Sequence, residues 1–175
     1  MKRNRFILFF ILTAALLLSA CQKPLEGDPF VRFRENFDAR FELECNGVSS
    51  VLVCEKDDDG LSLTFEAPET LKGYVFTCVG EECSLSFEDV TVSLTPDLAR
   101  VPNIIKEILA STSDQISSIT GESSESGTMT RVSANGISYL FRSDGTPESA
   151  EGVILGAEVK LKINEINFNT PEGEQ

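Results

Sequence analysis

The sequence of 175 residues contains no histidine, which removes the side chain that most often serves as a general base or metal ligand. It also contains no nucleophile elbow, no phosphate-binding loop and no dinucleotide-binding glycine motif, so the common signatures of hydrolases, NTPases and dehydrogenases are missing. The acidic residues either occupy the outward-facing positions of predicted strands or lie in turns. This placement gives no pair of carboxylates suited to general acid–base catalysis. We therefore expect no catalysis and no cofactor.

Basic residues are scarce. Lysine and arginine together number 15, against 28 aspartates and glutamates, which gives a net charge of −13. Binding to nucleic acid requires clustered lysine and arginine, so we expect no nucleic-acid partner. The acidity keeps an exported domain soluble, and it opposes flat binding to an anionic membrane.

A long apolar run occurs only at the N-terminus, at residues 6–18, where it is too short to span a bilayer comfortably but suits a signal-peptide core. Lys2, Arg3 and Arg5 precede this run, and Leu-Ser-Ala-Cys follows it at 18–21. The pattern resembles the bacterial lipobox, in which the cysteine sulfur receives a diacylglyceryl group and the signal is cut just before it. We therefore predict a signal peptide at 1–20 and a lipid-anchored Cys21.

Cleavage before Cys21 would leave 155 residues, enough for one domain with its own core. The predicted location is the extracytoplasmic face of the cell membrane, or an outer membrane where the envelope has one. Residues 21–36 read as the lipidated cysteine and a spacer, with some order near 30–33. We assign residues 37–169 to a single domain and 170–175 to a polar tail.

The other four cysteines would lie on the exported side of the membrane, where disulfides persist. Three pairings are open. A two-residue turn at Gly80-Glu81 would set Cys78 directly opposite Cys83, so we prefer that bridge, which leaves Cys45 to pair with Cys54. A metal site is disfavoured, because there is no C-x-x-C spacing and no histidine.

Alternation of apolar and polar residues predicts a domain made mostly of half-buried strands. The parity of this alternation changes twice, at 88–89 and at 164–165, which indicates a bulge or tight bend. The predicted strands are at residues 37–45, 51–54, 61–66, 71–79, 83–87, 90–94, 129–134, 137–142, 153–155 and 157–163, the last continuing to 168.

One helix is predicted at residues 101–111, where the apolar residues recur at the spacing of a single helical face. Ile116 and Ile119 would extend this helix or start a second one. The Ser-, Glu- and Gly-rich stretch at 121–128 is predicted to be a mobile loop.

In this order of elements, a short step formed by Pro68, Leu71 and Gly73 joins two central strands, and a late Asp-Gly turn at 144–145 is followed by Pro147. The arrangement resembles the LolA/LolB-like superfamily, and in particular small lipoproteins of Gram-positive bacteria. The resemblance implies a mainly β (α+β) fold. It also implies a curved antiparallel sheet, forming an open half barrel covered by one or two short helices, whose concave apolar face receives acyl chains.

The resemblance covers residues 37–168 and transfers no functional residue. Independently of the resemblance, the predicted sheet presents more apolar surface than one short helix can cover. The ligand-lining candidates are therefore Phe41, Leu63, Phe65, Phe76, Leu85, Phe87, Ile105, Leu109, Tyr139 and Phe141. We predict a non-catalytic lipoprotein that binds a lipid or other hydrophobic ligand. The alternative is a fully packed module that binds an envelope protein or has a structural role.

Overall fold

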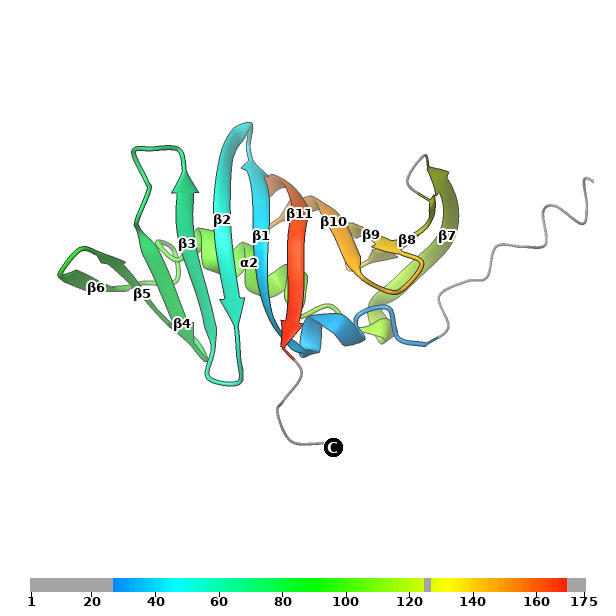
Figure 1. Cartoon of the computed structure of the whole chain (residues 1–175), viewed down its shortest axis with the longest axis horizontal. Coiled ribbons are helices and arrows are strands. Elements are labelled where there is room, and N and C mark those ends of the chain that lie inside the picture. The colour runs from blue at the N-terminus through cyan, green and yellow to red at the C-terminus, as the bar shows by residue number, and fades with distance from the viewer. Residues whose placement is uncertain (1–26, 125–126, 170–175) are drawn as a thin grey trace, which may run out of the picture.

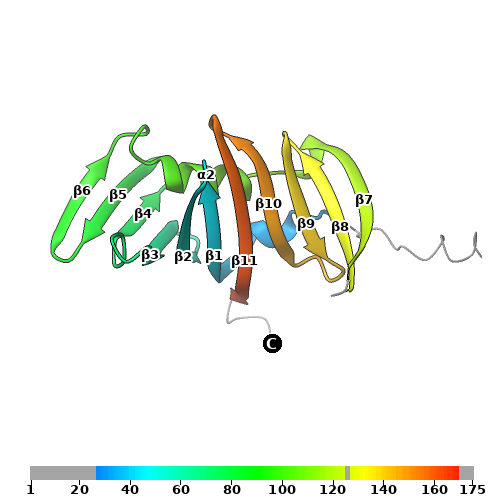
Figure 2. The ribbon, with the colours of Figure 1, turned by 90° about the horizontal axis from the view of Figure 1, so that it is seen from above.

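In the computed structural model, which describes residues 27–124 and 127–169, eleven antiparallel strands form one continuous sheet (Figure 1). The signal peptide, Cys21, most of the spacer and the polar tail lie outside the described residues. The strand order is β6-β5-β4-β3-β2-β1-β11-β10-β9-β8-β7, so the first and last strands of the chain pair in the middle. The described strands leave β6 and β7 as the two edges of an unclosed, curved sheet, in agreement with the predicted open half barrel (Figure 2).

The strands are β1 (Asn36–Cys45), β2 (Val48–Lys56), β3 (Leu61–Ala67), β4 (Val75–Val79), β5 (Glu82–Phe87), β6 (Val90–Leu94), β7 (Ile116–Ser124), β8 (Gly127–Ala134), β9 (Ile137–Arg142), β10 (Pro147–Ile154) and β11 (Ala157–Asn169). The helical elements are η1 (Val31–Arg34), α2 (Arg100–Leu109) and η2 (Ser113–Gln115). Helix α2 confirms the predicted helix, and β9 lies where alternation placed it.

The central pair β1–β11 explains the second change of parity. Arg40 pairs with Glu165 and Phe41 with Ile163, which leaves Asn164 as one extra residue in β11. Such a bulge shifts the later apolar residues of β11 back onto the inner face, where Phe168 lies opposite Phe37. The first change of parity, at 88–89, is the two-residue turn between β5 and β6.

Helix α2 lies on the concave side of the sheet, behind β2, β1 and β11 in the view of Figure 1. Ile104, Ile105 and Ile108 are fully buried on its inner face, as the helical spacing requires. The side chain of Lys106 fastens the helix to the sheet, because its Nζ donates a 2.7 Å hydrogen bond to the carbonyl of Gly80 in the β4–β5 turn.

Element η1 lies within the expected spacer and shows that this part of it is folded against the sheet. Phe30 and Phe33 are buried, and the Phe30 ring lies edge-on to Tyr139 at 5.0 Å and to Phe141 at 5.7 Å. The packed part of the chain therefore begins near Asp28, whose carboxylate accepts a hydrogen bond from the Phe30 backbone N–H, and not at residue 37. Some order near residues 30–33 was expected, but two aromatic residues three positions apart show no sustained period, so the sequence did not indicate that they join the core.

Residues 116–124 and 127–128 belong to β7 and β8, so the helical continuation and the mobile loop are both wrong for the described part of that segment. Ile116 lies opposite Ala134 and Glu122 opposite Met129 in the β7–β8 ladder. Pairing to a neighbouring strand satisfies the backbone groups of a polar segment that shows little strand pattern of its own.

The predicted strand at 71–79 also begins too early. Residues 68–73 form turns, in which the Leu71 N–H donates to the Pro68 carbonyl and the Gly73 N–H to the Phe65 carbonyl, and β4 starts at Val75. Gly73 has a φ of +84°, a conformation that glycine adopts without steric cost. The apolar residues 71 and 74 had suggested a longer strand.

Cys78 and Cys83 form the predicted disulfide across the β4–β5 turn, but the pairing of Cys45 with Cys54 is wrong. In the β1–β2 ladder, Cys54 lies opposite Ala39, six positions along β1 from Cys45. At a rise of roughly 3.3 Å per residue that is about 20 Å, whereas bridged cysteines have Cα atoms less than about 7 Å apart. Among the described residues, neither thiol has a disulfide partner.

Cys54 and Cys45 are expected to react very differently with an alkylating reagent. Burial raises the pKa of the Cys54 thiol to about 12, so at pH 8 it is neutral as well as inaccessible, whereas Cys45 is partly exposed. Mass spectrometry after iodoacetamide treatment should find Cys45 modified in the folded protein and Cys54 modified only after unfolding. Equal labelling of both thiols in the native state would contradict the β1–β2 register.

Candidate functional site

The ten ligand-lining candidates fall into a closed group and an open group. Phe41, Leu63, Ile105, Tyr139 and Phe141 are buried at the middle of the concave face and beneath η1. Phe65 and Phe76 are nearly as buried and lie against each other, with ring centroids 5.8 Å apart. Leu85 and Leu109 are partly exposed, and Phe87 is exposed.

The closed group has its polar atoms satisfied internally. The Tyr139 hydroxyl donates to the Ile108 carbonyl at 3.3 Å and lies 2.5 Å from the Ser111 hydroxyl, which ties β9 to the end of α2. Burial raises the pKa of Tyr139 to about 12, so the phenol stays neutral at physiological pH. Among the described residues, no buried side-chain nitrogen or oxygen lacks a hydrogen-bond partner. This part of the half barrel is filled by Phe30, Phe33 and α2, and needs no ligand.

Leu109 lies on α2, whereas Leu85 and Phe87 lie toward the β6 edge of the sheet, on the concave face of β4, β5 and β6, which we call the open wing. Its apolar side chains are Tyr74, Leu85, Phe87, Val90, Val92 and Leu94. Phe87 pairs with Val90, and Leu85 with Val92, across the β5–β6 ladder, so these side chains point to the same face. Figure 2 shows α2 over the middle of the sheet, with β5 and β6 extending beyond it.

The exposure of the open wing is unusual for strand residues of this type. Phe87, Val90 and Val92 have relative exposures of 37%, 66% and 50%. The Tyr74 and Phe87 rings stack with centroids 4.3 Å apart and form a flat apolar floor beside them. Contiguous apolar surface of this kind marks binding sites on soluble proteins.

Sequence reasoning named only Leu85 and Phe87 in the open wing and missed Tyr74, Val90, Val92 and Leu94. The signal for three of them was present, because alternation at 90–94 places Val90, Val92 and Leu94 on one face of β6. Their distance from the helix was not visible in the sequence, since it depends on where α2 crosses the sheet.

The disulfide hairpin forms the border between the two groups. Cys78 and Cys83 are buried, and the Lys106 ammonium lies 3.6 Å from the Cys83 sulfur as well as on the Gly80 carbonyl. These contacts hold β4 and β5 in place at the point where helix cover ends. The turn end of the β4–β5 hairpin, next to the open wing, is therefore fastened to α2.

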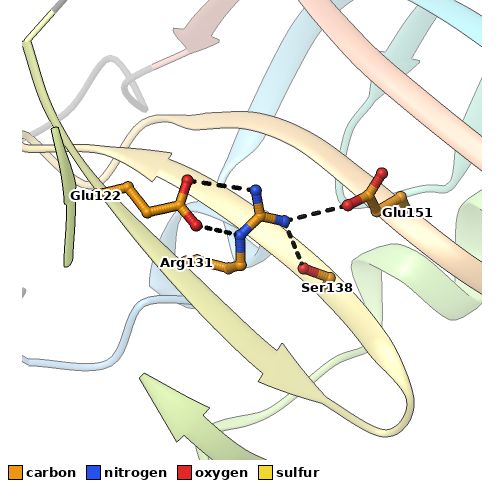
Figure 3. Close-up of polar contacts among 4 residues, drawn as sticks. All are labelled: Glu122, Arg131, Ser138 and Glu151. Atoms are coloured by element: carbon orange, nitrogen blue, oxygen red, sulfur yellow. Dashed lines mark hydrogen bonds and ion pairs between the residues drawn. The ribbon is translucent and has the colours of Figure 1, made fainter. Parts of the chain in front are cut away.

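The outer face of the sheet is polar, and its side chains form a network across β7 to β10 (Figure 3). The Arg131 guanidinium donates to both carboxylate oxygens of Glu122, to Ser138 at 2.9 Å and to Glu151 at 3.1 Å. The hydrogen bond from Arg131 holds the pKa of Glu122 below its usual range. Ion pairs at such exposed positions are screened by solvent, so the network adds little to stability.

A hollow of about 640 Å³ also lies on the outer face, between β2, β1, β11 and β10. Its rim carries Glu42, Glu44 and Glu151 opposite Lys160 and Lys162. Charges of both signs close together suit water and small polar molecules better than an acyl chain. The hollow also has apolar side chains in its lining, among them Val51, Ala67 and Pro68, but it is on the outer face and not on the concave face where the resemblance places a ligand.

No group of three or more histidine, cysteine, aspartate or glutamate side chains within residues 27–124 and 127–169 is placed to hold a metal ion. In the same part of the chain, no helix is long and apolar enough to cross a bilayer.

No protein-family model matches the sequence, and no curated protein matches it. Among solved structures, an uncharacterized conserved protein from Thermus thermophilus matches with a TM-score of 0.53 and 10% identity, over 79% of this chain and 81% of its own. MucB matches with a TM-score of 0.52 and 13% identity, over 83% of this chain, which spans only 59% of MucB.

A LolA superfamily protein from Nitrosomonas europaea matches more weakly, with a TM-score of 0.40 and 9% identity, over 78% of this chain and 87% of its own. At such identities a likeness concerns the fold alone and transfers no ligand or partner. The Thermus thermophilus protein and MucB are therefore similar to this chain in fold, and the open, curved antiparallel sheet agrees with the architecture that the sequence resemblance implied.

Proposed function

We propose that this protein is a lipid-anchored extracytoplasmic lipoprotein that binds a lipid or other hydrophobic ligand on the open wing and performs no chemistry. The observation that carries the proposal is the uncovered apolar surface at the end of β5 and on β6, where Phe87, Val90 and Val92 are all exposed. The Cys21 anchor would keep this surface close to the membrane from which such a ligand comes.

The energetics favour an apolar occupant. Removing apolar surface from water is worth about 25 cal/mol per Å², and burying a methylene about 0.8 kcal/mol. A ligand chain lying on the Tyr74–Phe87 floor would remove water from both its own methylenes and the valines of β6. A pre-formed surface also lowers the entropic cost of binding, because the disulfide and Lys106 already hold the hairpin.

The location of the ligand on the wing follows from what fills the rest of the barrel. Phe30 and Phe33 occupy the space above Tyr139 and Phe141, where an acyl chain would otherwise lie. The alternative function, a fully packed sheet without a ligand, requires cover over the whole concave face. The exposed side chains of β6 disfavour it.

Phe87→Glu is expected to reduce labelling by a photoactivatable diazirine analogue of palmitic acid at least tenfold. The new carboxylate would have to be desolvated by the bound chain, which is costly. The matched control is Val153→Glu, because Val153 is an equally apolar, exposed strand residue that lies on β10, away from the wing. Full-length protein freed of detergent is irradiated with the probe, and labelled peptides are identified by mass spectrometry.

Labelling confined to peptides of residues 74–94 in the unaltered protein and in Val153→Glu supports the proposal. Circular dichroism of Phe87→Glu is recorded to check that the variant remains folded. Labelling spread evenly over the chain, or undiminished in Phe87→Glu, would contradict an apolar site on the open wing.

A further inference from the structure

Strand β6 is an edge that lacks the usual protection against pairing. It has the sequence Val-Thr-Val-Ser-Leu, with no charge and no proline, and it pairs with β5 without a register shift. Soluble proteins normally protect an edge strand with lysine, proline or a bulge. The opposite edge is protected in this way, because β7 carries Glu122 and a register shift between Ile116 and Ser118.

The β5–β6 ladder shows which backbone groups of β6 have no partner among the described strands. The turn at 88–89 has two residues, so Phe87 and Val90 form the hydrogen-bonded pair that closes it. Hydrogen-bonded and non-bonded pairs alternate along an antiparallel ladder, which makes Val92 point its N–H and C=O toward β5. Thr91 and Ser93 therefore direct theirs away from the sheet.

The strand is also complementary to itself. When two copies of β6 run antiparallel with Val92 on the two-fold axis, Val90 faces Leu94 of the second copy and Thr91 faces Ser93. The apolar residues then share the concave face and the hydroxyl residues share the outer face. No like charges meet within the strand, although the chain as a whole carries a net charge of −13.

We propose that β6 is a homodimerisation edge, which pairs antiparallel with β6 of a second copy to continue the sheet across a two-fold axis. Symmetric contacts between identical surfaces are the commonest way in which proteins self-associate. The Thr91 and Ser93 backbone groups of the two copies would form the new hydrogen bonds. The open wings would become adjacent, and the apolar surface of Val90 and Val92 would run continuously from one copy to the other.

Val92→Cys tests this arrangement in the full-length protein within bacterial membranes, in a Cys45→Ser background that removes the other accessible thiol. The two-fold axis places residue 92 of each copy in a non-hydrogen-bonded pair, where Cα atoms lie about 4.5 Å apart and a disulfide fits. Oxidation with copper phenanthroline should give a band of twice the mass on a non-reducing gel. The matched control is Ile119→Cys on the other edge, which should cross-link at least tenfold less.

Adding Ser93→Pro to Val92→Cys should lower the cross-link yield at least tenfold. Proline there removes an outward N–H without breaking the β5 ladder. Adding Phe87→Glu should leave the cross-link in place, since Phe87 lies one strand inside the edge. Loss of palmitate labelling therefore tests the ligand proposal separately from the dimer.

Absence of the double-mass band, equal yields at residues 92 and 119, or resistance to Ser93→Pro would each overturn the homodimer. A cross-link from residue 92 to a protein of a different mass would overturn it as well, because a foreign strand would then occupy the edge.

Discussion

Replacing Phe30 by alanine is expected to lower the free energy of unfolding by about 3–5 kcal/mol, the usual cost of truncating a fully buried phenylalanine. The Phe30 ring is completely buried and contacts the rings of Phe33, Tyr139 and Phe141. Its loss would leave a cavity lined by aromatic faces that cannot close over it. Urea denaturation followed by circular dichroism measures the change.

Val31→Ala is the matched control, because Val31 is the next residue along the chain but is 48% exposed. We expect it to change the free energy of unfolding by less than about 0.5 kcal/mol. If Phe30→Ala proved as mild as Val31→Ala, η1 would not be part of the core. The concave face above Tyr139 would then be available to a ligand.

Cys21→Ser should transfer the protein from the membrane fraction to the soluble fraction while leaving the domain folded. In this proposal the lipid on Cys21 is what attaches the protein to the membrane. Each methylene of a lipid chain that is buried in the bilayer contributes about 0.8 kcal/mol to membrane binding, and serine at position 21 would carry no lipid. Folding should persist because the one disulfide of the described residues, Cys78–Cys83, does not involve residue 21. Cell fractionation with metabolic labelling by a palmitate analogue measures both consequences.

Cys45→Ser is the control for this experiment, since it removes a free thiol without touching the lipobox. It should remain in the membrane and retain the palmitate label. Retention of Cys21→Ser in the membrane would contradict lipid anchoring at Cys21, and unfolding of the variant would contradict the assignment of its cysteines.

Much of the fold was predictable from the sequence. Alternation from Phe37 to Cys45 and from Ile137 to Arg142 placed β1 and β9, and the isoleucine spacing placed α2. Each of these elements has one face in water and one in the core. Apolar residues therefore recur in the sequence at the spacing with which side chains return to the same face of a strand or helix. The bulge at Asn164 was visible for the same reason, because one extra residue inverts the parity of the alternation.

Strands whose stability comes from a neighbour were harder to predict. Residues 116–124 are rich in serine and show little alternation, yet they pair with β8 over their whole length. Their backbone hydrogen bonds, rather than their side chains, hold them in the sheet. Glu122 adds an ion pair to Arg131 that depends on a strand brought alongside by the ladder.

The cysteines show the limit of local reasoning most directly. Cys78 and Cys83 are five positions apart in the sequence and are joined by a tight turn at Gly80. Their relative position depends only on that turn, so it could be predicted from the sequence. Cys45 and Cys54 flank a turn as well, but their hairpin turns at Asn46-Gly47, next to Cys45 and far from Cys54. Pairing by elimination failed because it assumed that every exported cysteine is bridged.

By itself, the sequence determined the class of the protein: a β-rich, acidic chain with a lipobox-like N-terminus. These properties depend on composition and on short periods, whereas the open half barrel was expected only from the resemblance to the LolA/LolB-like superfamily. Only the tertiary structure decided which apolar residues are core and which are surface, because Phe41 and Phe87 obey the same alternation. The difference between them is that α2 crosses the sheet at β1 and stops short of β6, and this is a property of long-range packing.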